Sequence, residues 1–358
     1  MVLRVVKATG FLLLIIITIA AALLITVYRT LELFCEGPSP TARELFVTTF
    51  LETGSFKFVV PMLLDSNEIE EIVNKNSMEI IESDVKPELI EIAASTPASG
   101  STDDQVPFDP DGMELVAISG RTFYAKMLII NDPSRVTLST TYPWTDVGMD
   151  LKEHVEKNDA IAGVNGGLYY SIGNKGGHPY GVAVSNGEIQ YNDPQAWPGL
   201  YMVGFDNNDI LRIVNIANMT AEELEQYIID EGIRDAVAFQ EEYSDANNHF
   251  VQLIINGEPR VVEGLGSGAN PRTAIGQRAD GAVLLLVTDG RGASGNLGAT
   301  AADLIKIMSD YGAVNAANID GGSSSAMYVD GKYEMTSVTF YYSNSSWLLP
   351  TCFIVSRR

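Results

Sequence analysis

The residues best suited to chemistry in this chain follow a short apolar segment that ends at Asp320. Two glycines, Gly321 and Gly322, come next, and then three hydroxyl side chains that begin with Ser323 and Ser324. Glycines let the backbone adopt positive φ and approach a ligand closely. Hydroxyls and freed backbone N–H groups can donate to an anionic oxygen. A carboxylate beside these donors indicates a site for chemistry, although a simple polar turn can have the same composition.

Two earlier segments also run from apolar residues into Asn or Asp and then glycine. They are Asn165-Gly166-Gly167 and Asp289-Gly290. A further segment, Asn270-Pro271-Arg272-Thr273, places a guanidinium at the start of an expected strand. If these strand ends face one mouth, they bring together two carboxylates, an amide, an arginine and several hydroxyls. His178 follows Asn165 by thirteen residues and could reach the same mouth as an acid or phosphate ligand, or could be structural.

Taken together, the motifs resemble the phosphodiester glycosidase family over about residues 113–357. The resemblance rests on Asn165–Tyr169, Asn270–Ala274, Thr288–Arg291 and Asp320–Ser325. It implies hydrolysis of a sugar 1-phosphodiester, such as a GlcNAc-1-phosphodiester or an envelope glycopolymer, to free sugar and a phosphomonoester. The chain has Leu168 where an aromatic residue is usual in the family, and Ser323 where a third glycine is common. Both differences bear on substrate preference.

This reaction gives each motif an expected role. Breaking the anomeric C–O bond leaves positive charge on the sugar, which a carboxylate can stabilise, or water activated by the carboxylate can attack. We expect Asp320 to be nucleophile or base, Asp289 the second carboxylate, and Arg272 a bidentate phosphate clamp. The expected substrate-binding residues are Asn165, Gly166, Gly167, His178, Thr273, Gly321, Gly322, Ser323 and Ser324. We expect no cofactor, and the chain shows no Cys/His cluster or EF-hand spacing that would predict a metal.

Two non-enzymatic functions remain open from the sequence. The domain could bind an exopolysaccharide or cell-wall glycopolymer without cleaving it, or it could serve as an assembly protein whose residues 41–92 dock a partner. Paired carboxylates beside an arginine favour the enzyme, because a binding protein does not need them. The sugar, the stereochemical outcome and the oligomeric state are not determined by the sequence.

The elements that must position these residues lie in the C-terminal two thirds of the chain. From Met113 onward, short β-like runs alternate with turn residues, and capped helices are expected to begin at Thr220 and Thr300. This pattern predicts an α+β fold with mixed β-sheets and a few packed helices over residues 113–358. Residues 93–112 contain almost no large apolar side chains and predict a linker. Residues 31–92 predict a juxtamembrane segment that is helical and acidic.

The N-terminus carries the signal for a membrane. Residues 11–27 hold no charge, and with their flanks they just reach the length of a transmembrane helix. Arg4 and Lys7 precede them, which favours a cytoplasmic N-terminus. Residues 1–30 are therefore predicted to be a cytoplasmic tip and an uncleaved signal-anchor, with a cleaved signal peptide as the alternative. The chain would then be a single-pass protein of the cell membrane with its catalytic domain outside.

Charge and cysteines add two expectations. A net charge of −23 makes nucleic acid an unfavourable partner, because phosphates would be repelled. Cys35 and Cys352 could form a disulfide outside the cell, but their distance in sequence does not tell whether they meet.

Overall fold

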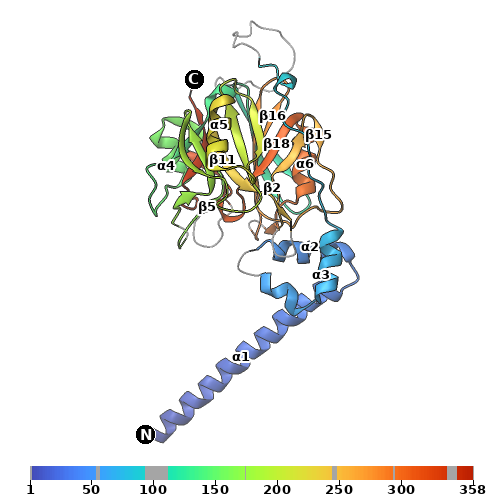
Figure 1. Cartoon of the computed structure of the whole chain (residues 1–358). Coiled ribbons are helices and arrows are strands. Elements are labelled where there is room, and N and C mark those ends of the chain that lie inside the picture. Colours follow the sequence, from blue (N-terminus) through green and yellow to red (C-terminus); the bar gives the residue numbers. More distant parts are fainter. Residues whose placement is uncertain are drawn as a thin grey trace, which may run out of the picture.

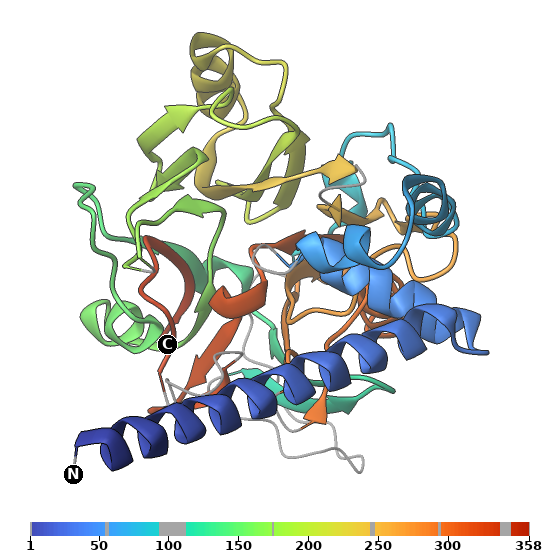
Figure 2. The same cartoon turned by 90° about the horizontal axis from the view of Figure 1, so that it is seen from below.

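The computed structural model describes residues 2–53, 57–92, 112–173, 175–243, 248–292, 295–336 and 345–357. Three β-sheets enclose one hydrophobic core, and a helix lies against the outer face of each sheet (Figures 1 and 2). The predicted α+β class is confirmed. Every pairing between named strands in the described residues is antiparallel. The predicted linker lies outside the described residues except for Gly112.

The largest sheet has seven strands. Their order is β1 (Met113–Ser119), β2 (Tyr124–Ile130), β17 (Val283–Thr288), β16 (Thr273–Arg278), β18 (Ala313–Ile319), β14 (Gln252–Ile255) and β15 (Glu258–Pro259). The interior strand β17 is buried along its whole length, because the core covers one face and helix α6 (Ala301–Asp310) the other. A strand that is covered on both faces does not need to alternate between apolar and polar residues, which explains the run of leucines and valines in β17.

Two five-stranded sheets complete the core. The first has the order β10 (Leu211–Asn215), β9 (Leu200–Asp206), β11 (Ile233–Gln240), β7 (Gly181–Ser185) and β8 (Glu188–Asp193), and α5 (Ala221–Asp230) packs on it. The second has the order β20 (Lys332–Thr336), β19 (Ala326–Val329), β4 (Ala160–Asn165), β21 (Thr351–Ser356) and β3 (Val136–Thr140), with α4 (Leu151–Lys157) outside. Two small hairpins are formed by β5 (Tyr169–Tyr170) with β6 (His178–Pro179), and by β12 (Glu242–Tyr243) with β13 (Asn248–His249). Short 3-10 turns occur at η3 (Pro133–Arg135) and η5 (Gly322–Ser324).

The two helix starts predicted inside the domain are confirmed. Thr220 and Thr300 cap α5 and α6, and each shares a capping box with an acidic residue three positions later. Gly232 and Gly312 follow these helices with positive φ, a conformation typical of the residue after a helix.

The N-terminal segment begins with the long helix α1 (Val2–Glu36), which extends away from the domain (Figure 1). One stretch of it, Thr9–Glu36, is long and apolar enough to cross a membrane, and its side chains from Thr9 to Thr30 are exposed. Helix α2 (Pro40–Leu51), the turn η1 (Lys57–Met62) and helix α3 (Ser66–Asn74) form a separate small core with the end of α1.

The expected helical segment is shorter than predicted. Helix α2 is capped by Ser39, and α-helical structure within the expected segment 31–92 ends at Asn74. Beyond it the chain is extended, with one turn at η2 (Pro87–Leu89), and it packs on the β domain. Val85 and Ile90 belong to the main core, so part of the segment assigned to the juxtamembrane region is integral to the domain.

The two cysteines are free and buried in different clusters. Cys35 lies in the α1–α3 core, and Cys352 lies beneath α4. No disulfide therefore joins the N-terminal segment to the last strand.

Candidate active site

Asp320 follows the last residue of β18, in the middle of the seven-stranded sheet. Its Oδ1 atom accepts a hydrogen bond from the Gly321 N–H at 2.9 Å, and the Ser324 hydroxyl donates to its carboxylate. Loss of hydration raises the pKa of Asp320 to about 7, although Ser324, the Gly321 N–H and the charge of Arg291 oppose the rise. A carboxyl group with such a pKa exchanges its proton at neutral pH, as acid–base catalysis requires.

Arg291 is the cation that faces Asp320. Its Nη1 atom donates to Ser323 Oγ at 2.7 Å, and a Cβ atom on Gly322 would lie 2.8 Å from its Nη2 atom. Gly322 also has a φ of +61°, so both the space and the backbone require glycine here. Desolvation and the charge of Arg272 lower the pKa of Arg291, whereas Asp320 and Glu52 raise it. Arg291 thus lies within the electrostatic reach of all three charges.

Tyr169 lies next to Ser324 and Asp320 in the site. Its hydroxyl lies 3.2 Å from Ser324 Oγ, and burial together with the charge of Asp320 raises its pKa. The tyrosine is therefore a neutral hydrogen-bonding group beside the carboxylate at physiological pH.

The floor of the site is a buried network around Asn165. Its Nδ2 atom donates to the Asp320 carbonyl at 2.6 Å, and its Oδ1 atom accepts from the Thr273 hydroxyl at 2.6 Å. Asn165 and Thr273 are fully buried, so both hold β4, β16 and the Asp320 turn together. Gly166 and Gly167 fit against this floor, because a Cβ on either would lie within 2.6 Å of the neighbouring Thr351 or Ala238.

Asp289 is also placed near the site, with both carboxylate oxygens engaged by the protein. Oδ1 accepts from the Tyr124 N–H and Oδ2 from Asn296 Nδ2, each at 2.7 Å. These bonds fix the loop that carries Arg291. The geometry therefore gives Asp289 a positioning task, whereas Asp320 is the carboxylate surrounded by donors of the site.

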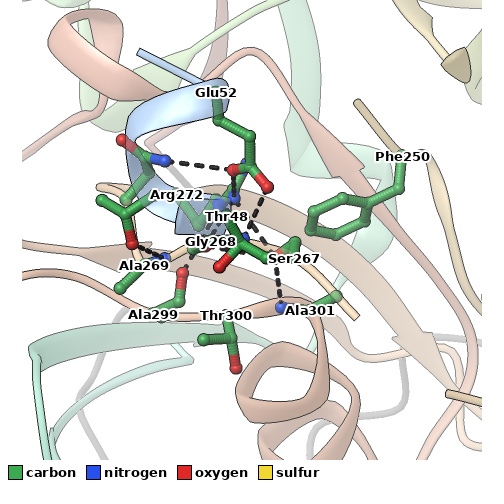
Figure 3. Close-up of polar contacts among 12 residues, drawn as sticks. Thr48, Glu52, Phe250, Ser267, Gly268, Ala269, Arg272, Ala299, Thr300 and Ala301 are labelled. Atoms are coloured by element: carbon green, nitrogen blue, oxygen red, sulfur yellow. Dashed lines mark hydrogen bonds and ion pairs between the residues drawn. The ribbon is translucent and has the colours of Figure 1, made fainter. Parts of the chain in front are cut away.

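Arg272 does not face Asp320 directly but points toward helix α2. Its Nη2 atom donates to Glu52 Oε2 at 2.5 Å and to the Gly268 carbonyl at 2.9 Å, and its guanidinium lies over the Phe250 ring (Figure 3). The side chains of Glu52 and Arg272 are 2% and 7% exposed, respectively. The predicted clamp is thus already occupied by a carboxylate of the same chain.

Backbone and amide donors complete the environment of Glu52. The Gly268 N–H donates to Oε1 at 2.5 Å, and Asn270 Nδ2 donates to Oε2 at 3.0 Å. The Ala269 N–H donates to Thr49 Oγ1 of the same helix at 3.0 Å. We call the donors of Gly268, Ala269, Asn270 and Arg272 the anion cradle. Burial raises the pKa of Glu52, and the cradle opposes that rise.

His178 lies apart from this network. Its ring is stacked between Tyr170 and Tyr191, and its Nδ1 atom lies 3.1 Å from the Pro179 carbonyl. Among the described residues, no group of three or more His, Cys, Asp or Glu side chains is placed to hold a metal ion.

The structure adds residues that the sequence did not assign. Arg291 and Tyr169 lie within the recognised motifs, so their roles could have been considered. No sequence pattern identifies Glu52, because a glutamate in a helical segment cannot be recognised from the sequence as the partner of an arginine 220 residues later.

Comparisons with known proteins match the part of the chain that contains these motifs. A family model described as phosphodiester glycosidase matches residues 158–356, more than half of the chain. The SPbeta prophage-derived uncharacterized protein YomE of Bacillus subtilis (strain 168) is 26% identical over 209 residues. That match covers 56% of this chain but only 28% of the relative.

A solved structure shares the fold. It is the catalytic domain of zebrafish N-acetylglucosamine-1-phosphodiester alpha-N-acetylglucosaminidase, described as auto-inhibited by its pro-peptide. The identity is 16% and the TM-score 0.50, with 73% of this chain and 87% of the other covered.

Proposed function

Because this chain belongs to the phosphodiester glycosidase family, we propose that it hydrolyses a sugar 1-phosphodiester to a free sugar and a phosphomonoester. The observation that carries the proposal is the meeting of the Asp320 carboxyl group with Arg291, Ser323 and Ser324. A group that titrates near neutral pH then lies beside donors suited to a phosphate.

We assign the general base of this reaction to Asp320. The bond between the anomeric carbon and the phosphate oxygen breaks, and its electron pair leaves with the phosphate. A water oxygen takes its place on the carbon while the Asp320 carboxylate accepts the water proton. The phosphomonoester is a good leaving group, so the reaction has little need for a strong general acid.

Arg291, Ser323 and Ser324 are assigned to the departing phosphate. A guanidinium and hydroxyls that are held in place before the reaction stabilise charge that develops in the transition state. Ser323 is fixed by Arg291, and Ser324 by Asp320 and Tyr169, so both side chains are held in place before the substrate binds. Asn165, Thr273, Gly166 and Gly167 support this site from below, and Gly321 and Gly322 shape it.

We further propose that the anion cradle takes a phosphate oxygen of the substrate once Glu52 leaves it. The carboxylate of Glu52 already shows that the Gly268 N–H, Asn270 and Arg272 bind an anion together. The zebrafish relative is described as auto-inhibited by its pro-peptide. In this chain, helix α2 is proposed to act comparably, by filling the cradle with Glu52 until the helix moves.

The proposed location is the outer face of the cell membrane. Residues 11–27 would span the bilayer with the N-terminus in the cytoplasm, as Arg4 and Lys7 favour. The substrate would then be a sugar phosphodiester of the cell envelope.

The test is hydrolysis of a GlcNAc-1-phosphodiester with a methyl or aryl group as the second ester. Full-length protein in detergent should release free GlcNAc and the phosphomonoester, and Asp320→Asn should not. Since α2 occupies the cradle, the assay is run in parallel with Glu52→Gln. Binding of the diester without release by both forms would overturn the enzyme and favour a glycopolymer-binding protein.

A further inference from the structure

Five rings from four separate chain segments form a continuous surface beside the candidate active site. We call Tyr170, His178, Tyr180, Tyr191 and Trp197 the aromatic strip. Tyr170, His178 and Tyr191 form a near-parallel stack, with ring centroids 5.4 and 5.7 Å apart. Tyr180 lies edge-on to the first two rings, and Trp197 contacts Tyr180 at 5.4 Å.

The strip is not part of a hydrophobic core. None of its five residues belongs to the core clusters of the described chain. Tyr170 and Trp197, at its two ends, are 42% and 41% exposed, while the three rings between them are partly buried. The two end rings leave aromatic surface exposed to solvent, and exposed apolar patches commonly mark binding sites.

The chemistry of the strip fits a saccharide. A pyranose ring offers a face of C–H bonds to an aromatic face and hydroxyls to polar groups around it. Tyr and Trp combine an apolar body with a hydrogen-bonding tip. A protein partner would more often need aliphatic neighbours, but the one large aliphatic side chain at this hairpin, Ile172, is outside the ring contacts.

The strip and the active site share the β5–β6 hairpin. Tyr169 on β5 places its hydroxyl against Ser324, and Tyr170 is the next residue. Successive side chains of a strand point to opposite faces. One face of the hairpin therefore borders Asp320, and the other carries the strip through Tyr170 and His178, which pair across the hairpin.

We propose that the aromatic strip binds further sugar units of a polymeric substrate whose phosphodiester is cleaved at Asp320. This inference rests on the proposed function and deepens it, because it selects glycopolymers over small sugar phosphodiesters. His178 holds Tyr170 in place by stacking, which gives the predicted substrate-binding histidine a positioning role.

The experiment compares three probes by two readouts. The probes are a polymer of GlcNAc units joined through 1-phosphodiester bonds, polyglycerol phosphate as a polymer without sugar, and the methyl ester of GlcNAc-1-phosphate. Binding to the full-length protein in detergent is measured by calorimetry, and hydrolysis by release of the sugar or of the phosphomonoester. The variants are Tyr170→Ala, Trp197→Ala and the pair, with Ile172→Ala as control, since Ile172 is 64% exposed on the same hairpin.

Loss of both rings should weaken binding of the sugar phosphate polymer about tenfold, which corresponds to about 1.4 kcal/mol. The preference for polymer over methyl ester in kcat/KM should fall by the same factor, and Ile172→Ala should keep it. Unchanged polymer binding in the folded double variant would overturn the strip as a saccharide site and favour a protein partner there. Binding is measured independently of turnover, so a protein that cleaves no diester would refute the proposed function and still test the strip.

Discussion

The carboxyl group of Asp320 loses hydration in the folded protein, and its pKa rises to about 7 from the 3.8 of an exposed aspartate. A general base must be deprotonated to accept a proton. The rate of hydrolysis should therefore rise with pH up to about 7 and then level off, if Asp320 is the base. In Asp320→Asn the rate should fall by about 10²–10⁴-fold, and the inflection near pH 7 should disappear. Rates of sugar release across pH 5–9 check this.

The matched control for that measurement is Asp146→Asn, which removes an exposed aspartate for which no side-chain bond is found in the described chain. It should keep the wild-type profile. An Asp320→Asn variant that is folded and retains the same rate and inflection would contradict the assignment.

A substitution of Arg291 gives a second test of a single residue. Its planar guanidinium reaches Ser323 and faces Asp320, and a lysine there would keep the charge but lose the fork of donors. Arg291→Lys should lower kcat/KM by about 10²-fold, as loss of one preorganised donor does. Arg278→Lys, at an exposed ion pair with Asp280, should keep wild-type kinetics. A folded Arg291→Lys with full activity would refute the phosphate role.

The sequence predicted the residues of this site unevenly. Asp320 and its serines were found because glycine and hydroxyl residues beside a carboxylate form a local pattern. Asn165 and Thr273 were expected to bind the substrate. Both are buried, so they belong to the supporting network and offer no free surface to a substrate. Asp289 was expected as a second carboxylate, and its two bonds to Tyr124 and Asn296 depend on chain packing that spacing cannot show.

At the scale of elements, we propose that helix α2 controls access to the anion cradle. Its last turn brings Thr49 and Glu52 to Gly268–Asn270, so the helix must move before a phosphate can enter. An enzyme whose competent state is only partly populated has its apparent affinity reduced by that fraction. Weakening the contact should therefore raise activity.

Two variants weaken it by different means. Glu52→Gln removes the charge, and Gly268→Ala places a Cβ within 2.5 Å of the Thr49 backbone while the side chains of Glu52 and Arg272 stay the same. Both should raise kcat/KM for the small diester, about tenfold or more if the contact is worth at least 1.4 kcal/mol. Glu70→Gln, an exposed change on α3, should not. Lower activity in both folded variants would indicate that α2 completes the site instead of blocking it.

Strands were easier to predict than the N-terminal helices. The apolar runs of β4, β9 and β17 are short and bounded by turn residues, so their positions follow from the sequence. Residues 75–92 have a helical, acidic composition, but Val85 and Ile90 find more apolar surface on the β domain than a helix could give them. Tertiary packing overrides local preference there.

At the scale of the whole molecule, α1 is the proposed attachment to the membrane. Its window of 18 residues has a hydropathy typical of a membrane span, and no part of it is buried in the protein. Full-length protein should therefore remain with membranes through carbonate washing and be released only by detergent. A chain that starts at Thr30 should be soluble and keeps Leu31 and Cys35 of the small core, so its comparison with the full chain isolates the effect of the membrane span. Release of the full chain by carbonate alone would contradict an integral anchor.

The anion cradle binds the side chain of Glu52, so a synthetic ligand could imitate that side chain. Tethering gives α2 a high effective concentration at Arg272, so the intramolecular contact can be weak and still dominate. A free peptide with the sequence of residues 39–53 lacks that advantage, and a helix stapled in its bound conformation would recover part of it. Such a peptidomimetic, with a carboxylate at the position of Glu52, is a rational starting point for a competitive inhibitor of variants whose own helix has been disabled.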